Sequence, residues 1–462
     1  MEKFDVFRGI KSIHFVGIGG ISMSALAKLV LNRGIAVSGS DLKKTNIIFE
    51  LENLGAKVFI GHNAKNIDNA DIVVFTSAVQ ENNVEVIEAK KLGILVYERA
   101  DFLYLIALNY NNVIAISGTH GKTTACGMLA SIFIAANKNP TVHIGGECSC
   151  TQGNLKIGDK NFFISEVCEY QRHLLKMPHN VGVILNIEYD HPDYYKNLAE
   201  VGDAFSEFSN ISKELTVIGE KYSIFMKKIN KKTFRTFTIS GNGDYVAKNI
   251  RQYVKGVIKF DCYKYGNFFG SFCINAFGKF NVNNALASIV VADYYNIPTN
   301  DIFNGLKNFC GVKRRYEFMG KINNCPVIHD YAHHPTQIEN VIKSTKEIFK
   351  KPVVCVFQPH TYSRTIKLFT QFVNAFSLAD KLILFPTYPA REKPIKNASA
   401  KSLFNALNFK FKNSNYLTSY KSVLKHLSKL ENCVILILGA GDIVDLAETI
   451  KSKSNIDNFC NQ

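Results

Sequence analysis

The stretch that most restricts the fold of this chain is Ser117-Gly118-Thr119-His120-Gly121-Lys122-Thr123-Thr124. An apolar run at residues 113–116 precedes it and predicts a buried strand, and residues 124–136 have helical character. A strand, a Gly-containing turn with Lys and Thr, and a helix are typical of a phosphate-binding loop. Such a turn directs backbone N–H groups and the positive helix N-terminus at phosphate. The stretch therefore predicts a phosphate site.

Two side chains of this loop have expected roles. Lys122 should reach the terminal phosphates, and Thr123 should offer its hydroxyl to Mg²⁺. The spacing is tighter than the general G-x-x-x-x-G-K-[ST] pattern, because Ile116 stands five residues before Gly121. A Gly turn with an incidental Lys is the alternative, but the two consecutive threonines after Gly-Lys argue against it.

The length and composition indicate a globular protein of several domains. A chain of 462 residues is too long for one ordinary core, so two to four domains are expected. Apolar residues make up 47% and charged residues 20%, the proportions of soluble proteins. No apolar run reaches the ~18 residues of a membrane span, and no signal-peptide pattern is present. We expect a cytoplasmic protein without membrane insertion.

Cysteine usage argues against a disulfide-stabilised protein, and the charge pattern argues against a nucleic-acid-binding protein. The eleven cysteines are odd in number, scattered and without a C-x-x-C, which predicts reduced, mostly buried thiols. Cys148 and Cys150 form a C-x-C that could bind metal, although core or loop thiols are the preferred interpretation. The net charge of +16 comes from dispersed lysines without a basic block, so nucleic-acid binding is not expected. Such a surface also suits polyanionic substrates.

Residues 1–108 have the pattern of a Rossmann-like domain. A strand at 11–16 leads into Gly17-Ile-Gly19-Gly20, followed by a helix at 21–33 and a strand at 35–40 that ends in Asp41. The turn predicts close approach of a phosphate but does not specify the nucleotide, because Ser22 replaces the third Gly of G-x-G-x-x-G. Asp41 is placed for a ribose hydroxyl, and an ordinary helix cap is its alternative.

Three more strands complete this domain, at residues 56–60, 71–75 and 94–97. Thr76 and Ser77 follow one strand and Arg99 follows another, at the carboxyl ends where open parallel sheets bind ligands.

Residues 109–312 add polar clusters beside the phosphate loop. Strands at 161–166 and 181–186 lead to Glu169 and His191, and oxygen-rich groups at strand ends suit Mg²⁺. Helix capping by Asp190 is the alternative for the acid-rich turn after the second strand. Residues 212–275 indicate strands joined by Gly/Asn turns. Asn281 and Asn284 open a helix that extends to residue 294, where they can cap the helix or bind a purine.

Residues 313–462 predict another parallel sheet. Strands at 327–329, 353–357, 381–385 and 434–438 each end in a polar or Gly-rich cluster. These ends should share one edge, where a second substrate would bind. His333 and His334 could suggest zinc, but adjacent residues of a strand face apart and no third soft ligand has suitable spacing.

Taken together, these motifs resemble the Mur ligase family. They occur in family order between residues 14 and 442. The motifs are His14-Phe-Val-Gly-Ile-Gly-Gly20, Ser38-Gly-Ser-Asp41, Gly118-Thr-His-Gly-Lys-Thr-Thr124, Asn186-Ile-Glu-Tyr-Asp-His191, Arg314-Arg315, Asp330-Tyr-Ala-His-His-Pro-Thr336, Phe357-Gln-Pro-His360 and Gly439-Ala-Gly-Asp442.

The resemblance implies three α/β domains and one reaction. A Rossmann-like domain at 1–108 would bind a UDP substrate, a mostly parallel P-loop domain at 109–312 would bind ATP and Mg²⁺, and a Rossmann-like domain at 313–462 would admit an amino acid. The implied reaction joins L-alanine to the lactyl carboxylate of UDP-N-acetylmuramate through an acyl phosphate, giving ADP and phosphate, in peptidoglycan precursor synthesis. The sequence does not give the oligomeric state, so a homodimer is one of the alternatives.

The resemblance also carries roles to matching positions. Lys122, Glu169, His191, His334 and Arg364 are the expected catalytic residues; His334 and Arg364 lie near the incoming amino acid. Thr123, Glu169 and His191 would serve Mg²⁺. ATP would contact Gly118, Thr119, His120, Gly121, Lys122, Thr123, Thr124, Asn281, Asn284, Arg315 and Asp330. The UDP substrate would contact Gly17, Gly19, Gly20, Asp41, Thr76, Ser77 and Arg99.

The chain departs from the family pattern at a few positions. Cys168 and Tyr170 flank Glu169, where the family often has Asp and Ser. Thr361 stands where some members have an Arg that helps to hold the amino-acid carboxylate, which leaves more of that contact to Arg364. No equivalent of the carboxylated Lys of other Mur ligases is proposed.

Three alternatives compete with this interpretation. A recycling ligase of the same family attaches a whole tripeptide, although the His-His-Pro-Thr and Phe-Gln-Pro-His stretches look closer to the alanine-adding enzymes. A nucleotide-dependent oxidoreductase built on the first domain would leave the Lys122 loop without a purpose. A non-catalytic UDP-sugar sensor would bind its ligand without turnover.

Overall fold

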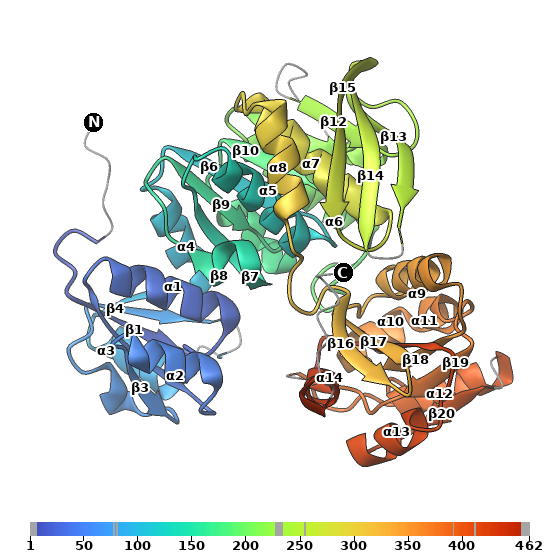
Figure 1. Ribbon diagram of the computed structural model, residues 1–462. Helices are drawn as coiled ribbons and strands as arrows, with labels where there is room; N and C mark the ends of the chain where they lie inside the picture. The colour runs from blue at the N-terminus through green and yellow to red at the C-terminus, as the bar shows by residue number, and fades with distance from the viewer. Residues whose placement is uncertain are drawn as a thin grey trace.

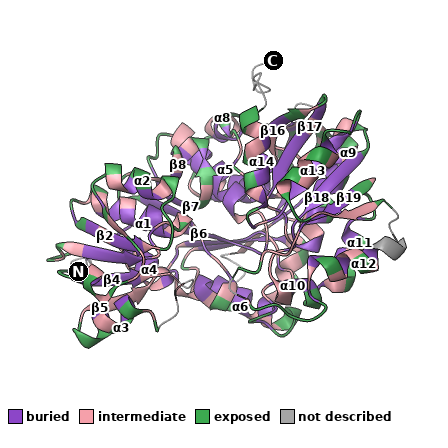
Figure 2. Cartoon of the chain, turned by 90° about the horizontal axis from the view of Figure 1, so that it is seen from below, coloured by how far each residue is buried: buried purple, intermediate pink, exposed green. Residues whose placement is uncertain are grey.

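The computed structural model describes residues 7–76, 79, 82–226, 234–253, 256–390, 392–410 and 413–453. Three α/β domains follow one another along the chain, each built around one sheet (Figure 1). The first and third domains contact different ends of the central one: both lie below it in Figure 1, at the left and at the right, and the central sheet lies between them in Figure 2. The predicted fold class is confirmed.

The first domain contains a five-stranded parallel sheet in the order β3-β2-β1-β4-β5. Its predicted strands and first helix are confirmed to within a few residues. The first helix ends at Asn32, and Gly34 adopts a φ of +75° directly after it. The elements are β1 (Ser12–Val16), α1 (Ile21–Asn32), β2 (Ala36–Asp41), α2 (Asn46–Asn53), β3 (Lys57–Ile60), β4 (Ile72–Phe75), α3 (Val84–Lys91), β5 (Leu95–Glu98) and α4 (Arg99–Ala107).

The central domain has a ten-stranded sheet in the order β15-β14-β13-β12-β11-β10-β6-β9-β7-β8. The strands from β13 to β7 are parallel, and β14, β15 and β8 add antiparallel edges. The strands are β6 (Asn112–Ser117), β7 (Thr141–Cys148), β8 (Gly153–Lys156), β9 (Phe162–Glu166), β10 (Val181–Ile184), β11 (Leu215–Gly219), β12 (Phe234–Thr238), β13 (Tyr245–Gln252), β14 (Val257–Lys264) and β15 (Asn267–Asn275).

Helices cover both faces of this central sheet. Helices α5 (Lys122–Ala135), α7 (Phe280–Tyr294) and α8 (Thr299–Asn308) contribute to the core on one face, and α4 and α6 (Leu198–Ile211) contribute to the core on the other. The strands of this sheet form a buried layer between these helices (Figure 2). The stretch predicted to bind phosphate runs from the end of β6 into the start of α5, so the predicted strand–loop–helix arrangement is present.

The third domain has a six-stranded sheet in the order β16-β17-β21-β18-β19-β20. The four strands expected to share an edge are parallel neighbours, while β16 pairs antiparallel with β17. The strands are β16 (Glu317–Ile322), β17 (Cys325–Asp330), β18 (Val353–Phe357), β19 (Lys381–Leu384), β20 (Ser414–Tyr416) and β21 (Val434–Leu438). The helices are α9 (Pro335–Phe349), α10 (Tyr362–Lys367), α11 (Phe369–Ala375), α12 (Ala400–Lys410), α13 (Tyr420–Leu427) and α14 (Ile443–Lys453).

The first two domains share a hydrophobic core through α4. Phe102 and Ile106 of α4 are fully buried in one cluster with Phe15 of β1 and with Phe163 and Ile184 of the central sheet. Because this helix also begins with Arg99, the shared core fixes the position of that side chain relative to the central domain. In the described part of the chain, no helix is both long and apolar enough to cross a membrane.

We predict that Gly305→Ala destabilises the central domain. A Cβ at Gly305 of α8 would lie 2.4 Å from Cα of Ile132 in α5, so the two helix backbones would have to separate. Overpacking costs about 1–3 kcal/mol and should exceed the ~1 kcal/mol gained by replacing a helical glycine. The melting temperature measured by calorimetry should fall by several degrees. The exposed neighbour Lys307→Ala should leave it within a degree or so, and an unchanged G305A melting point would contradict the prediction.

Candidate active site

The phosphate loop needs glycine at two positions. Gly118 has a φ of +139° and Gly121, at the N-cap of α5, has a φ of +84°. A Cβ on Gly121 would lie 2.6 Å from Oδ1 of Asn284, so this position also needs the missing side chain. Asn186 holds the loop from beneath, because its side chain accepts from the His120 N–H at 2.7 Å and donates to the His120 carbonyl at 2.9 Å.

Lys122 and Glu169 form an ion pair directly beneath this loop. Nζ of Lys122 lies 2.8 Å from Oε2 of Glu169 and also donates to the Gly118 carbonyl. Burial alone would lower the pKa of Lys122, but the Glu169 carboxylate raises it above its usual value. Burial would raise the pKa of Glu169, yet the charge of Lys122 and the hydrogen bond to His191 bring it to about 2. Both side chains are therefore charged at neutral pH.

Two of the three expected Mg²⁺ residues, Glu169 and His191, lie next to each other. Nε2 of His191 is 3.6 Å from Oε1 of Glu169, on the side of the carboxylate opposite to Lys122. Burial lowers the pKa of His191, but the charges of Asp190 and Glu169 raise it overall. Thr123 begins α5 with Lys122, and its hydroxyl accepts from Nη2 of Arg315 at 3.4 Å.

A cavity of ≈ 1260 Å³ opens beside the phosphate loop, between the central and third domains. It brings together expected ATP residues from four separate parts of the chain. Those that line it are His120, Gly121, Thr124, Asn281, Asn284, Arg315 and Asp330.

The polar residues of this cavity are held in defined orientations. Asn284 donates to Oδ1 of Asn281 at 2.8 Å, and Asn281 donates to the Phe277 carbonyl at 2.7 Å. Asp330 accepts the backbone N–H of Tyr316 at 2.8 Å. Burial raises the pKa of Asp330, and the nearby Arg315 charge opposes that rise.

Two aromatic rings complete the cavity and were not expected from the sequence. Phe277 and Tyr316 both line it and stack with their ring centroids 4.4 Å apart. Phe277 lies just before α7 in the central domain, and Tyr316 lies just before β16, at the end of the segment that leads from α8 into the third domain. No short motif marks them, because their role depends on the way this segment folds.

The glycine turn of the first domain is closed by Asp41. Gly17 has a φ of +82°, and a Cβ there would meet Thr76 at 2.7 Å. The Gly19 N–H donates to Oδ2 of Asp41 at 2.9 Å. Asp41 does not cap α2, whose N-cap residue is Thr45.

Gly20 and Ser77 were also expected to contact the UDP substrate. Gly20 is the N-cap residue of α1, at the end of the same turn. Ser77 lies outside the described residues.

Arg99 and Lys122 line a second cavity of ≈ 200 Å³, between the first and central domains. Arg99 donates to the Ser22 hydroxyl at 3.3 Å. Glu166 also lines this cavity and has a buried Oε2 without a hydrogen-bond partner. The cavity therefore connects the first domain to the phosphate-loop lysine, a link that none of the motifs predicted.

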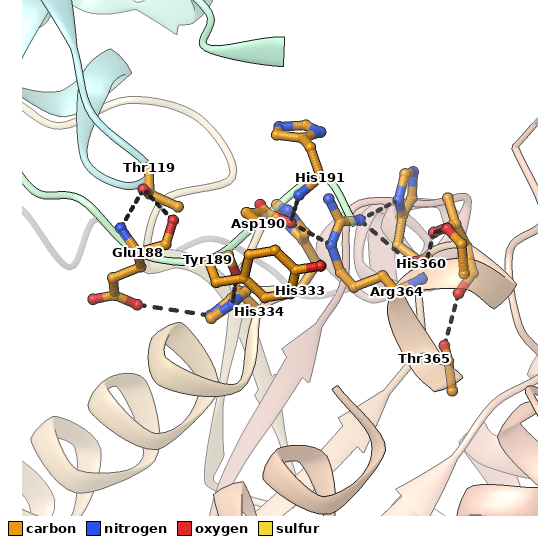
Figure 3. A network of polar contacts seen from close by, with 12 residues as sticks. Thr119, Glu188, Tyr189, Asp190, His191, His333, His334, His360, Arg364 and Thr365 are labelled. Carbon is orange, nitrogen blue, oxygen red and sulfur yellow. Dashed lines mark hydrogen bonds and ion pairs between the residues drawn. The ribbon is translucent and has the colours of Figure 1, made fainter. Parts of the chain in front are cut away.

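Arg364 of the third domain pairs with Asp190 of the central domain. Nε of Arg364 lies 2.9 Å from Oδ1 of Asp190, and both side chains are about 95% buried (Figure 3). Burial would raise the pKa of Asp190, but the charge of Arg364 holds it well below its usual range. Asp190 does not cap α6, whose N-cap residue is Asn197. Arg364 also donates to Nδ1 of His360 at 3.2 Å.

Thr361 supports the turn that carries Arg364. It has a φ of +67°, unusual for a β-branched residue, and its hydroxyl accepts the Arg364 N–H as the N-cap of α10.

His334 lies at the contact between the same two domains. As the N-cap residue of α9, its Nδ1 accepts the Thr336 N–H, while Nε2 donates to the carbonyl of Tyr189 at 3.2 Å (Figure 3). Burial lowers the pKa of His334 to about 4, so the ring is neutral at pH 7. Its ring also packs against His120 with centroids 5.0 Å apart.

Gln337 connects the third domain to the phosphate loop and was missed by the sequence analysis. Its Oε1 accepts the backbone N–H of His333 and of His334, which fixes the orientation of the amide. Nε2 of Gln337 must then donate to Nδ1 of His120 at 2.9 Å, which places the His120 proton on Nε2, facing Glu188 at 3.2 Å. The helix-capping spacing of His334 and Gln337 is the one sequence signal that could have indicated it.

This hydrogen-bond network argues against zinc. Ligand atoms of His120, Glu188 and His334 lie within 4.8 Å of one another. However, Nε2 of His120 carries its proton toward Glu188, and both ring nitrogens of His334 already have partners. A metal would have to displace these hydrogen bonds, so the cluster is better described as a contact between domains.

Comparisons with known proteins place this geometry in a family. Three family models match the chain: the catalytic domain of the Mur ligase family at residues 12–111, the Mur ligase middle domain at 116–292, and the Mur ligase glutamate ligase domain at 314–441. UDP-N-acetylmuramate--L-alanine ligase of Clostridium beijerinckii is 43% identical over 445 residues, which is 95% of this chain and 97% of that protein. The enzyme of the same name from Clostridium tetani is 43% identical over 448 residues, with 96% and 98% covered.

Solved structures show the same similarity. The UDP-N-acetylmuramate-alanine ligase of Thermotoga maritima has a TM-score of 0.82 at 28% identity, covering 96% of this chain and 98% of that one. A murein peptide ligase from Psychrobacter arcticus shares the fold, with a TM-score of 0.69 at 23% identity.

We predict that acid weakens the contact between the second and third domains through His334. The pKa of this side chain is about 4 in the fold and 6.5 ordinarily, so the neutral ring stabilises the contact fully above pH 6.5 and progressively less down to pH 4. Protonation would place a hydrogen on Nδ1, which could no longer accept the Thr336 N–H. Amide-exchange protection of Thr336 should therefore fall over this range. His334→Asn should cap α9 without titrating, and an equal fall in that variant would contradict the prediction.

Proposed function

This chain belongs to the Mur ligase family, and from this premise we propose that it joins L-alanine to UDP-N-acetylmuramate with cleavage of ATP. The products would be UDP-N-acetylmuramoyl-L-alanine, ADP and phosphate, in peptidoglycan precursor synthesis. Full-length relatives at about 40% identity carry this activity in their names.

One observation carries the proposal: the phosphate loop separates two cavities that suit different substrates. The larger cavity, on the side of Asn281 and Arg315, has the size for ATP and a mostly apolar lining with a few polar side chains, as nucleotide sites do. The smaller one joins Lys122 to Arg99 of the first domain. A carboxylate that enters from the first domain would therefore meet the terminal phosphate of ATP at Lys122.

The proposed reaction proceeds through an acyl phosphate. The substrate carboxylate attacks the γ-phosphorus, ADP leaves, and the amine of L-alanine then attacks the activated carbonyl and displaces phosphate. Repulsion between the carboxylate and the triphosphate opposes the first step. The charge of Lys122 and the N-terminus of α5 offset this repulsion, because their dipoles and charges are fixed in place before the reaction.

We also propose that Mg²⁺ binds at Thr123, Glu169 and His191. Glu169 and His191 lie 3.6 Å apart, and the carboxylate of Glu169 and the hydroxyl of Thr123 are oxygen donors of the kind that Mg²⁺ prefers. When bound, Mg²⁺ would neutralise phosphate charge. The carboxylate of Glu169 is ionised at neutral pH, since its pKa is about 2, and would be the charged ligand of the ion.

The amino acid is proposed to bind on the third-domain side, near Arg364 and His360. The guanidinium of Arg364 is fixed by Asp190, which leaves it oriented at the contact between the domains. The contact of this domain with the phosphate loop, through Gln337 and His120, would help to keep water from the acyl phosphate.

Phosphate release with UDP-N-acetylmuramate, ATP and a panel of amino acids tests the proposal. Release with L-alanine, and less with glycine or L-serine, is the expected result. Release with the tripeptide of cell-wall turnover but not with free L-alanine would overturn the assignment in favour of the recycling ligase.

We predict that Lys122→Met lowers kcat by at least about 10³-fold, because one preorganised charge at the reacting phosphate is removed. Methionine keeps the length of the side chain but leaves Glu169 unpaired, so folding should be checked by circular dichroism. Lys28→Met, which removes a surface pair with Glu50, is the matched control and should retain wild-type turnover. A K122M enzyme within tenfold of wild type would contradict the role of Lys122.

A further inference from the structure

Two cysteines outside the proposed reaction lie in direct contact. Cys148 ends β7 and Cys150 lies in the short 3₁₀ turn that follows, Ser149–Thr151. Their sulfur atoms are 2.9 Å apart. The backbone therefore already brings the two thiols together, and a disulfide bond of about 2.05 Å needs only a small further approach.

The two thiols differ in exposure and in acidity. Cys150 is partly exposed, whereas the side chain of Cys148 is 2% exposed. The hydrogen bond from Cys148 lowers the pKa of Cys150 against the effect of burial. The same contact, together with burial, raises the pKa of Cys148. A partly exposed thiol of lowered pKa in contact with a buried second thiol is the arrangement of redox-active cysteine pairs.

We propose that Cys148 and Cys150 form a redox-active dithiol, which a small peroxide converts into an intramolecular disulfide that slows turnover. The disulfide step is independent of the proposed function, and its effect on turnover rests on that function.

The chemistry balances within the pair. The Cys150 thiolate attacks one oxygen of hydrogen peroxide, the O–O bond breaks, and hydroxide leaves with a proton from solvent as water. The Cys148 sulfur then attacks the sulfur of the resulting sulfenic acid, and its own proton leaves with the displaced hydroxide as a second water. The two thiols lose two electrons in total, and the peroxide gains them.

The position of the pair connects it to the proposed ATP site. Cys148 lines the larger cavity, and its Sγ lies 3.5 Å from the carbonyl of Gly311. Its backbone pairs with Val312, in the segment that leads from α8 to Arg315. Cys150 contacts the carbonyl of Gly127 in α5 at 3.6 Å. A disulfide removes both S–H donors, so it changes the packing between the phosphate-loop helix and the connection to the third domain.

Other thiols are poorer candidates for the same chemistry. Cys126 is fully buried next to the pair, and burial raises its pKa well above the usual value. Cys310 is exposed in the connecting segment, and its Sγ donates to the Asn308 carbonyl at 3.4 Å, so it serves as a control. Cys325 and Cys433 lie 3.5 Å apart, but both are buried in the core of the third domain.

Peptide mass mapping after peroxide treatment of the full-length protein tests the first half of the proposal. Trypsin should release residues 139–156, which contain Cys148 and Cys150 and no other cysteine. After treatment and alkylation, this peptide should be two hydrogens lighter than its unalkylated dithiol form. Doubly alkylated peptide, or Cys150 oxidised to sulfinic acid with Cys148 free, would overturn the proposal.

Turnover of the same samples tests the second half. The rate of phosphate release with UDP-N-acetylmuramate and L-alanine should fall in proportion to the fraction of protein that carries the disulfide, and by at least threefold when the disulfide is complete. Dithiothreitol should restore the rate. Cys150→Ser should resist the loss, whereas Cys310→Ser should behave as wild type. A complete disulfide with unchanged turnover would overturn the effect on catalysis, and reduced wild-type protein without any turnover would instead contradict the proposed function.

Discussion

The ion pair between the largely buried Lys122 and the buried Glu169 is the interaction on which the site depends. Two opposite charges taken out of water are tolerated only when each satisfies the other, and removal of one leaves an unpaired buried charge. Glu169 lies after β9 and Lys122 starts α5, so their contact fixes the phosphate loop against the neighbouring strand. The same carboxylate reaches toward His191 on its other side. The loop, the proposed metal ligands and the strand edge therefore hold one another in place.

A second set of contacts joins this assembly to the third domain. Asp190 follows the same strand edge as the loop and pairs with Arg364, while His120 of the loop itself accepts a hydrogen bond from Gln337. The nucleotide site is thus sensitive to the position of the domain proposed to bind the amino acid. Coupling of this kind suits a reaction whose intermediate is destroyed by water, because the intermediate forms only where both domains meet.

The sequence was sufficient to predict the helices and strands whose own residue pattern matches their burial in the fold. The strand at 112–117, the glycine turn and α5 follow from apolar runs and from glycines with positive φ, which depend on few neighbours. The third-domain strands were equally clear, since β18 and β21 are continuous buried runs. Contacts between distant segments could not be predicted in this way. The sequence suggested that Asp190 caps a helix, because its actual partner, Arg364, is 174 residues away. No sequence motif marks the stacked rings of Phe277 and Tyr316.

Helix α4 has a mechanical consequence for the whole chain. Its apolar side chains are common to the interiors of the first and central domains, so these two domains cannot rotate apart without exposing them to water. The third domain is attached through the segment after α8, through polar contacts and through the packing of Tyr189 and Phe277 against its core. Fewer apolar side chains bridge these two domains than bridge the first two, so their separation exposes less apolar surface to water. The contact between the first and central domains is therefore rigid, and the contact between the central and third domains opens more easily. Any large opening movement that admits or releases substrates should occur at the second.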